Sequence, residues 1–134
     1  DLNALDYNRR FYYSGTHSYF ASWIRFRLSH EGKALRHDGG FREEYMRFFF
    51  AEGFSAVFVL YNADSSVDAP QLLVGVNPHT DYASIPHESI DTSAFMQVAD
   101  HERFERTGLR TALFPIDEEK VHLPPHSCGL WIRK

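Results

Sequence analysis

The sequence predicts a mainly β protein in which one amphipathic helix precedes a C-terminal antiparallel β-sandwich of Greek-key type. Two observations support this fold class. After residue 37, short apolar runs alternate with turn-forming residues about every eight to twelve positions, a spacing typical of sandwiches. Before that point, one segment instead carries apolar residues at helical spacing. We therefore divide the chain into residues 1–37, which contain the helix, and residues 38–134, which form an all-β domain.

The helix is expected between His17 and Glu31. Its apolar residues fall at positions i, i+3, i+4 and i+8, which places them on one face: Phe20, Trp23, Ile24 and Leu28. Thr16 or Ser18 offers a hydroxyl that can accept a free amide of the first turn, and Gly32 offers a C-terminal stop. So aromatic a face has to pack against something large, either the β domain or another domain.

The predicted strands follow a turn at residues 38–40. Two of them are apolar on both faces and are therefore expected in the interior of a sheet: residues 54–61 and residues 72–77. The remaining strands are expected at residues 45–50, 82–85, 95–98, 113–116, 120–123 and 129–133. Glu52 and Gly53 are expected to form a hairpin turn, and the charged segment 100–107 is expected to be a loop.

The composition argues against several classes of function. With 134 residues, 43% of them hydrophobic, the chain has material for one well-packed domain. A net charge of -4 with no clustered basic face argues against nucleic acid as a partner. No apolar run approaches the ~20 residues that span a bilayer, so we expect no membrane partner. Cys128 is the only cysteine, which excludes an internal disulfide, and we expect it to be a small buried apolar residue.

We predict no catalytic residue, no metal site and no cofactor in this chain. Neither a Gly-x-Ser-x-Gly nucleophile motif nor a glycine-rich phosphate loop occurs. The eight histidines are scattered. His122 and His126 are four residues apart, but Pro124 and Pro125 lie between them and prevent the helix that would align them on a metal ion.

Sugar binding is the chemistry that the residues leave open. Exposed aromatic rings can stack on sugar rings, while acids and amides bond to the hydroxyl groups. His79, Asp81 and Tyr82 lie together on one predicted loop, and Trp131 lies in the last strand, either exposed or buried. These four residues are candidate sugar contacts, and an ordinary surface loop is the competing interpretation.

Three patches of the chain together resemble one protein family. The first is Asn3-Ala4-Leu5-Asp6 with the helix through Ala21-Ser22-Trp23-Ile24-Arg25-Phe26-Arg27, followed by Ala34-Leu35-Arg36. The second is the strand at residues 72–77, which is rich in valine and ends in Asn77. The third is Val121-His122-Leu123-Pro124-Pro125-His126-Ser127-Cys128-Gly129-Leu130-Trp131. In this order they resemble the C-terminal region of α-amylase-superfamily glycoside hydrolases, of the pullulanase and isoamylase-like debranching branch.

The resemblance implies the non-catalytic C-terminal domain of an enzyme that cleaves α-glucosidic bonds in starch, glycogen or pullulan. The helix would then derive from the catalytic barrel of the same polypeptide, and Phe20, Trp23, Ile24 and Leu28 would pack on that barrel. The family's catalytic carboxylates lie on earlier barrel strands, and no position here matches them.

The barrel is therefore the expected partner, and an α-glucan is a second candidate. An independent carbohydrate-binding or protein-binding β-sandwich is the alternative interpretation. Whether the parent enzyme prefers α-1,6 or α-1,4 bonds, and whether it is cytoplasmic or exported, stays open.

Overall fold

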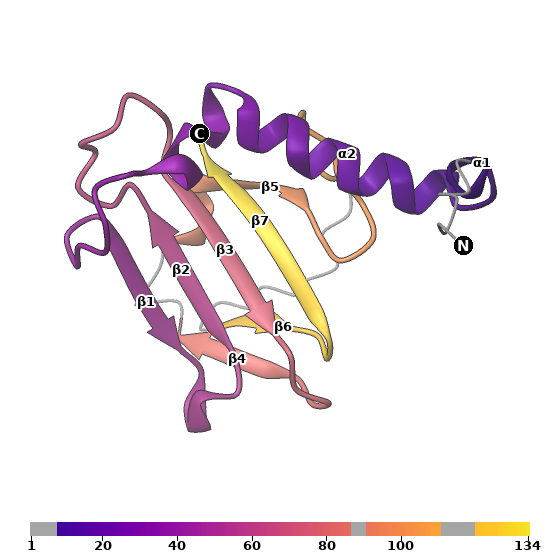
Figure 1. The fold of residues 1–134 in the computed structure, drawn as a ribbon. Helices are drawn as coiled ribbons and strands as arrows, with labels where there is room; N and C mark the ends of the chain where they lie inside the picture. The colour runs from indigo at the N-terminus through magenta and orange to yellow at the C-terminus, as the bar shows by residue number, and fades with distance from the viewer. Residues whose placement is uncertain (1–7, 87–90, 111–119) are drawn as a thin grey trace, which may run out of the picture.

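The computed structural model describes residues 8–86, 91–110 and 120–134. A helical segment comes first and is followed by strands (Figure 1). The helical elements are α1 (Arg9–Tyr12), α2 (Ser14–Leu28) and the 3-10 helix η1 (Glu31–Arg36). The prediction of a mainly β protein that begins with a helix is confirmed.

Seven strands form two antiparallel sheets within the described ranges. The larger sheet has the spatial order β1 (Met46–Phe50), β2 (Val57–Tyr61), β3 (Leu72–Asn77), β7 (Ser127–Arg133) and β5 (Phe95–Ala99). The smaller sheet pairs β4 (Ala83–Pro86) with β6 (Lys120–Leu123). Two short 3-10 helices, η2 (Glu52–Phe54) and η4 (Thr92–Ala94), precede β2 and β5.

Most predicted strands are confirmed, and β3 matches its prediction at both ends. The turn at Glu52 and Gly53 is also confirmed, since Gly53 adopts a φ of 69° that favours glycine. The predicted strand at residues 113–116 lies outside the described residues, as does the Asn3–Asp6 patch. Neither α1 nor η1 is predicted from the sequence.

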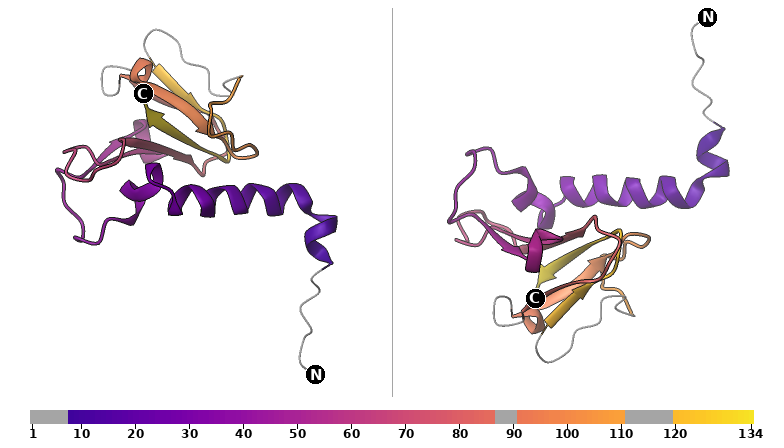
Figure 2. Two further views of the ribbon diagram at one scale, coloured as in Figure 1. Left: turned by 90° about the horizontal axis from the view of Figure 1, so that it is seen from above. Right: turned by 90° about the horizontal axis from the view of Figure 1, so that it is seen from below.

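The large sheet is covered on both faces, as the two further views in Figure 2 show. On one face, Phe26 of α2 shares a core with Leu72 and Leu130 of the sheet. On the other face, Ala83 of β4 and Leu123 of β6 share a core with Phe58, Leu73 and Trp131 of the large sheet. The helix thus belongs to the same packed unit as the strands.

Close packing between the two sheets depends on Gly75 of β3. A Cβ atom at this position would lie 2.6 Å from Cε1 of Phe58 and 3.2 Å from a methyl group of Leu123. Because interiors are packed at the density of organic crystals, no side chain fits here without displacing the Phe58 ring.

The helix ends earlier than predicted. Its C-cap is Ser29, whose Oγ donates a hydrogen bond to the carbonyl of Phe26 and accepts one from the N–H of Gly32, at 2.7 and 3.2 Å. A Cβ on Gly32 would lie 2.0 Å from the Phe26 carbonyl oxygen. Gly32 is therefore needed where the chain folds back over the end of the helix, and Ser29 provides the stop.

The predicted apolar face of α2 divides into two parts. Trp23 is half-buried and packs its ring edge-on to Phe104, with ring centroids 5.2 Å apart. Phe20, Ile24 and Leu28 are instead 60%, 60% and 64% exposed. The helix residue that inserts fully into the core is Phe26, which widens the apolar stripe beside these four residues.

Replacement of Phe26 by alanine should lower the free energy of unfolding by about 3–5 kcal/mol, because it leaves a cavity in a fully buried site. Phe20→Ala is the matched control and should change it by about 0.5 kcal/mol or less. Urea unfolding of both variants measures the difference. Equal losses in the two variants would contradict the assignment of the helix faces.

Candidate functional site

The loop that carries His79, Asp81 and Tyr82 is positioned by a buried amide. Nδ2 of Asn77 lies 2.9 Å from each of three carbonyl oxygens, those of Asp81, Leu123 and Pro124. Its Oδ1 accepts a hydrogen bond from the N–H of His79 at 3.0 Å. These hydrogen bonds tie the loop to β6. Without them the fold would be less stable, because the desolvation of the buried amide would not be compensated.

The structure separates the three candidate sugar contacts of this loop. Nδ1 of His79 lies 3.6 Å from a carboxylate oxygen of Asp81, and both side chains are largely in solvent. Tyr82 instead lines a groove of about 620 Å³ with residues that precede it in the chain: Phe50, Ala51, Glu52 and Ser55. Ala83 and Ser84 complete the lining.

This groove has the composition of a sugar-contacting surface. Tyr82 and Phe50 are 65% and 51% exposed, and so offer two aromatic rings to one ligand. Glu52, Ser55 and Ser84 add a carboxylate and two hydroxyl groups. The Ser84 hydroxyl lies 2.7 Å from Nδ1 of His122 on the neighbouring strand. The contribution of Phe50 and Glu52 is not evident from the sequence, since only the fold brings the end of β1 and the turn after it next to β4.

Trp131 takes no part in such a surface. It is 4% exposed and packs on Phe58, with ring centroids 5.5 Å apart. Because the β4–β6 pair covers its face of the sheet, a sugar ring cannot reach it. This burial removes Trp131 from the candidate sugar contacts.

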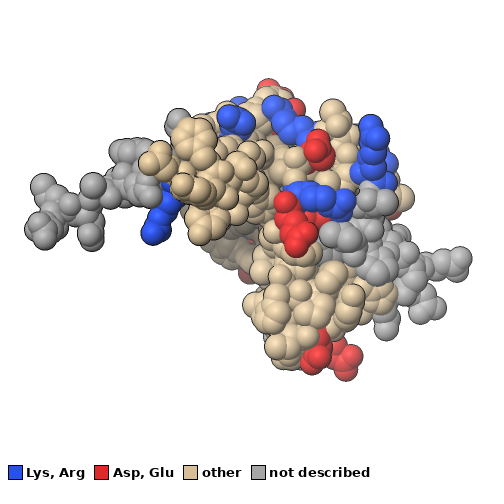
Figure 3. Space-filling view, turned by 90° about the vertical axis from the view of Figure 1, so that its right-hand side faces the viewer, with Lys and Arg blue, Asp and Glu red and all other residues tan. Residues whose placement is uncertain are grey.

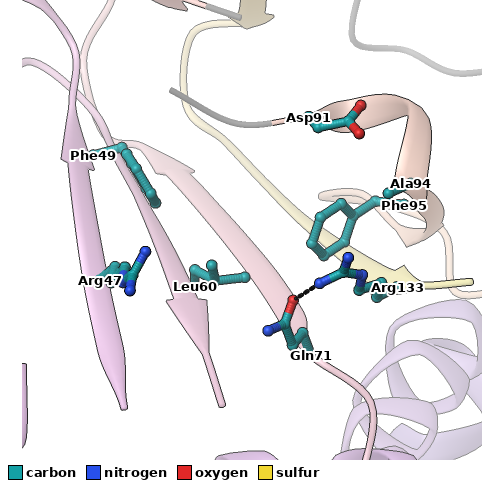
Figure 4. A pocket seen from close by; sticks show the side chains of 8 residues that line it. All are labelled: Arg47, Phe49, Leu60, Gln71, Asp91, Ala94, Phe95 and Arg133. Atoms are coloured by element: carbon teal, nitrogen blue, oxygen red, sulfur yellow. Dashed lines mark hydrogen bonds between the residues drawn. The ribbon is translucent and has the colours of Figure 1, made fainter. Parts of the chain in front are cut away.

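A second cavity, of about 210 Å³, lies on the same face of the large sheet as the β4–β6 pair (Figure 4). Phe49, Leu60 and Phe95 give it an apolar lining. Arg47 and Arg133 extend toward it from different strands, β1 and β7. The lining also includes Gln71, Asp91 and Ala94.

The exposed apolar side chains gather on the α2 side of the large sheet. Phe20, Ile24 and Leu28 form a row along the helix. By strand register, Phe48 and Phe50 share the α2-side face with Val74, and they stack with ring centroids 6.2 Å apart. In Figure 3 basic and acidic side chains gather on one part of the visible side of the molecule, and other parts of that side are largely uncharged.

A buried carboxylate holds α2 and the loop after β5 in place. The Asp100 side chain is fully buried and lies 2.7 Å from Nη2 of Arg103, and its Oδ1 accepts hydrogen bonds from the N–H groups of Glu102 and Arg103. Burial opposes ionisation, but these hydrogen bonds and the guanidinium outweigh it and lower the pKa of Asp100. On the helix, the Tyr19 hydroxyl donates to the backbone carbonyl of Asp100 at 2.7 Å.

Burial raises the pKa of the Tyr19 hydroxyl to about 12. This hydroxyl also lies 3.8 Å from Sγ of Cys128, which is half-buried in β7. Within the described ranges, no three His, Cys, Asp or Glu side chains gather closely enough to hold a metal ion. None of the helices described has the length and apolar character needed to cross a bilayer.

Comparison of the chain with family models, with curated proteins and with solved structures gives no match. The function therefore has to be argued from the sites themselves.

Asp100→Asn should lower the free energy of unfolding at pH 7 by about 3 kcal/mol, because it breaks a buried ion pair. The folded-state pKa is lowered, so the stabilisation is present above the unfolded pKa of about 3.9 and is lost as pH falls through the folded value. Denaturant unfolding at pH 7 and at about pH 3 tests this, and the deficit of the variant should shrink at the lower pH.

Glu31→Gln serves as the control, since its ion pair with Arg106 is partly exposed and should contribute about 0.5 kcal/mol. An Asp100→Asn deficit that is the same at both pH values would contradict an ionised role for the carboxylate.

Proposed function

We propose that this chain is the non-catalytic C-terminal domain of an α-glucan-cleaving glycoside hydrolase of the debranching type. In this proposal its two unequal sheets are a β-sandwich of Greek-key type, and the domain packs on the catalytic barrel of the same polypeptide and stabilises it. The family assignment rests on the three sequence patches that resemble such enzymes.

The observation that carries the proposal is the exposed apolar row Phe20, Ile24 and Leu28 on α2. The helix already has a face that packs on the large sheet through Phe26, so this row is not needed for the fold of the chain itself. Large exposed apolar patches on soluble proteins mark sites of contact with other protein surfaces. A barrel that covers the row would remove it from water.

The surroundings of the row fit a protein partner. Phe11, Tyr12 and Tyr13 of the α1 region extend the apolar surface, and all three are exposed. The only charged residues of α2 are Arg25 and Arg27, so a complementary surface would carry acidic groups at its rim. Large aromatic residues and arginine are also the residues most enriched in protein interfaces.

The mass of the natural polypeptide tests the proposal directly. An antibody raised against this chain should detect, in a lysate of the source cells, a band several times heavier than 15.6 kDa. A single band near that mass would overturn the proposal.

Ile24→Glu should leave the stability of the isolated chain within about 0.5 kcal/mol, because Ile24 is exposed there. In the full-length polypeptide the same change should lower the thermal midpoint by several degrees, since it buries a charge in the barrel contact. Ser18→Glu, an added charge at an exposed position of the same helix, is the control. Identical midpoints for both full-length variants would show that α2 has no barrel contact at Ile24.

The groove at Tyr82 favours a second candidate function, contact with α-glucan by the domain itself. Two exposed aromatic rings and a carboxylate face one groove there. This function is compatible with the barrel contact, because no residue of the groove belongs to the α2 row of Phe20, Ile24 and Leu28.

Tyr82→Ala should reduce the retardation of the protein in gels that contain amylopectin or glycogen, because it removes one stacking surface. Tyr12→Ala removes another exposed aromatic ring, outside the groove, and should migrate as the unaltered protein does. If the unaltered protein is not retarded in either gel, the groove does not bind α-glucan.

A further inference from the structure

Two arginines, Arg47 and Arg133, line the cavity of Figure 4. In the part of the chain that the structure describes, neither Arg47 nor Arg133 forms an ion pair with a carboxylate. Arg133 Nη1 donates instead to the amide oxygen of Gln71 at 2.6 Å. Three other arginines each pair with a carboxylate at 2.7–3.2 Å: Arg42, Arg103 and Arg106.

The two guanidinium groups share one cavity because of the sheet order. Arg47 lies on β1 and Arg133 at the end of β7, with β2 and β3 between them. Strand pairing places Leu60 opposite Arg47 in the register, on the same face of the sheet. Figure 4 shows the Leu60 and Gln71 side chains between the two arginines.

Like charges that line one cavity repel each other, and an anion bound between them would offset that repulsion. The guanidinium fork also matches the paired oxygens of a carboxylate or phosphate group. Asp91 at the rim forms no ion pair with Arg47 or Arg133, and its Oδ1 accepts hydrogen bonds from the N–H and the hydroxyl of Ser93. Charge and geometry both favour a small oxyanion as the ligand.

The apolar lining of the cavity indicates that the oxyanion is attached to an apolar group. The Phe49 and Phe95 rings and the Leu60 side chain line the cavity beside the arginines (Figure 4). A hydrated inorganic ion would leave this surface without a partner, whereas a ring attached to the oxyanion would cover it. At about 210 Å³, the cavity is smaller than the ~300–1,000 Å³ of most ligand pockets, so it fits a single ring.

We propose that this cavity binds a small organic oxyanion, a carboxylate or a phosphate carried on one ring, with Arg47 and Arg133 as its anion-binding residues. The site is independent of the proposed barrel contact. It lies on the β4–β6 side of the large sheet, so it stays accessible when the α2 side is covered.

Calorimetric titration of the protein with benzoate, phenyl phosphate and benzyl alcohol tests the proposal. Benzoate, phenyl phosphate or both should bind, and benzyl alcohol, the neutral ring of similar size, should bind at least tenfold more weakly. Added salt should weaken binding of the anions. The stronger of the two anions identifies the oxyanion that the site prefers. Benzyl alcohol binding as tightly as the anions, or no binding by either anion at tens of millimolar, would overturn the proposal.

Arg47→Gln should weaken binding of the preferred anion at least tenfold, because it removes a charge-assisted hydrogen bond. This variant should stay folded, since Arg47 is exposed on an edge strand. Arg25→Gln removes an exposed arginine of α2 and should bind as the unaltered protein does. A folded Arg47→Gln protein that retains full affinity would mean that the arginines of the cavity do not bind the anion.

Discussion

The fold depends on two central strands that are apolar on both faces. In β3, Leu72 and Leu73 are both buried but belong to different cores, and in β7 Leu130 and Trp131 repeat the pattern. Each face of the sheet therefore needs a cover, which α2 provides on one side and the β4–β6 pair on the other. A single helix and a two-stranded ribbon are marginally stable alone, so the covers depend on the sheet as much as the sheet depends on them.

The strands could be predicted because their signals are local. The run at residues 72–77 is apolar on both faces and is bounded by turn residues, and β3 follows it at both ends. The partner of each helix face could not be predicted. Helical spacing identified Phe20, Trp23, Ile24 and Leu28 as one apolar face, but only Trp23 contacts the sheet. A helix that is apolar over most of its circumference gives no local sign of which side its own domain covers.

The same distinction applies to the candidate sites. Tyr82 could be singled out as an aromatic residue on a loop, because that requires only its neighbours in sequence. Its groove partners Phe50 and Glu52 come from the end of β1 and the turn after it, which meet β4 only in the folded chain. Trp131 could not be assigned because its burial depends on the β4–β6 pair crossing its face of the sheet. Arg47 and Arg133 come from different ends of the β region, and only strand order brings them to one cavity.

The two sides of the large sheet consequently suit different partners. On the α2 side, exposed apolar residues outnumber charged ones along the helix, and a surface of that kind is stabilised when a second protein surface displaces water from it. On the β4–β6 side, aromatic and aliphatic groups lie in hollows lined partly by charged and polar groups, which suits small polar ligands with one apolar face. Because α2 and the cavity of Arg47 and Arg133 lie on opposite faces of the sheet, a protein partner on α2 and a small ligand in that cavity can bind together without competing for the same residues.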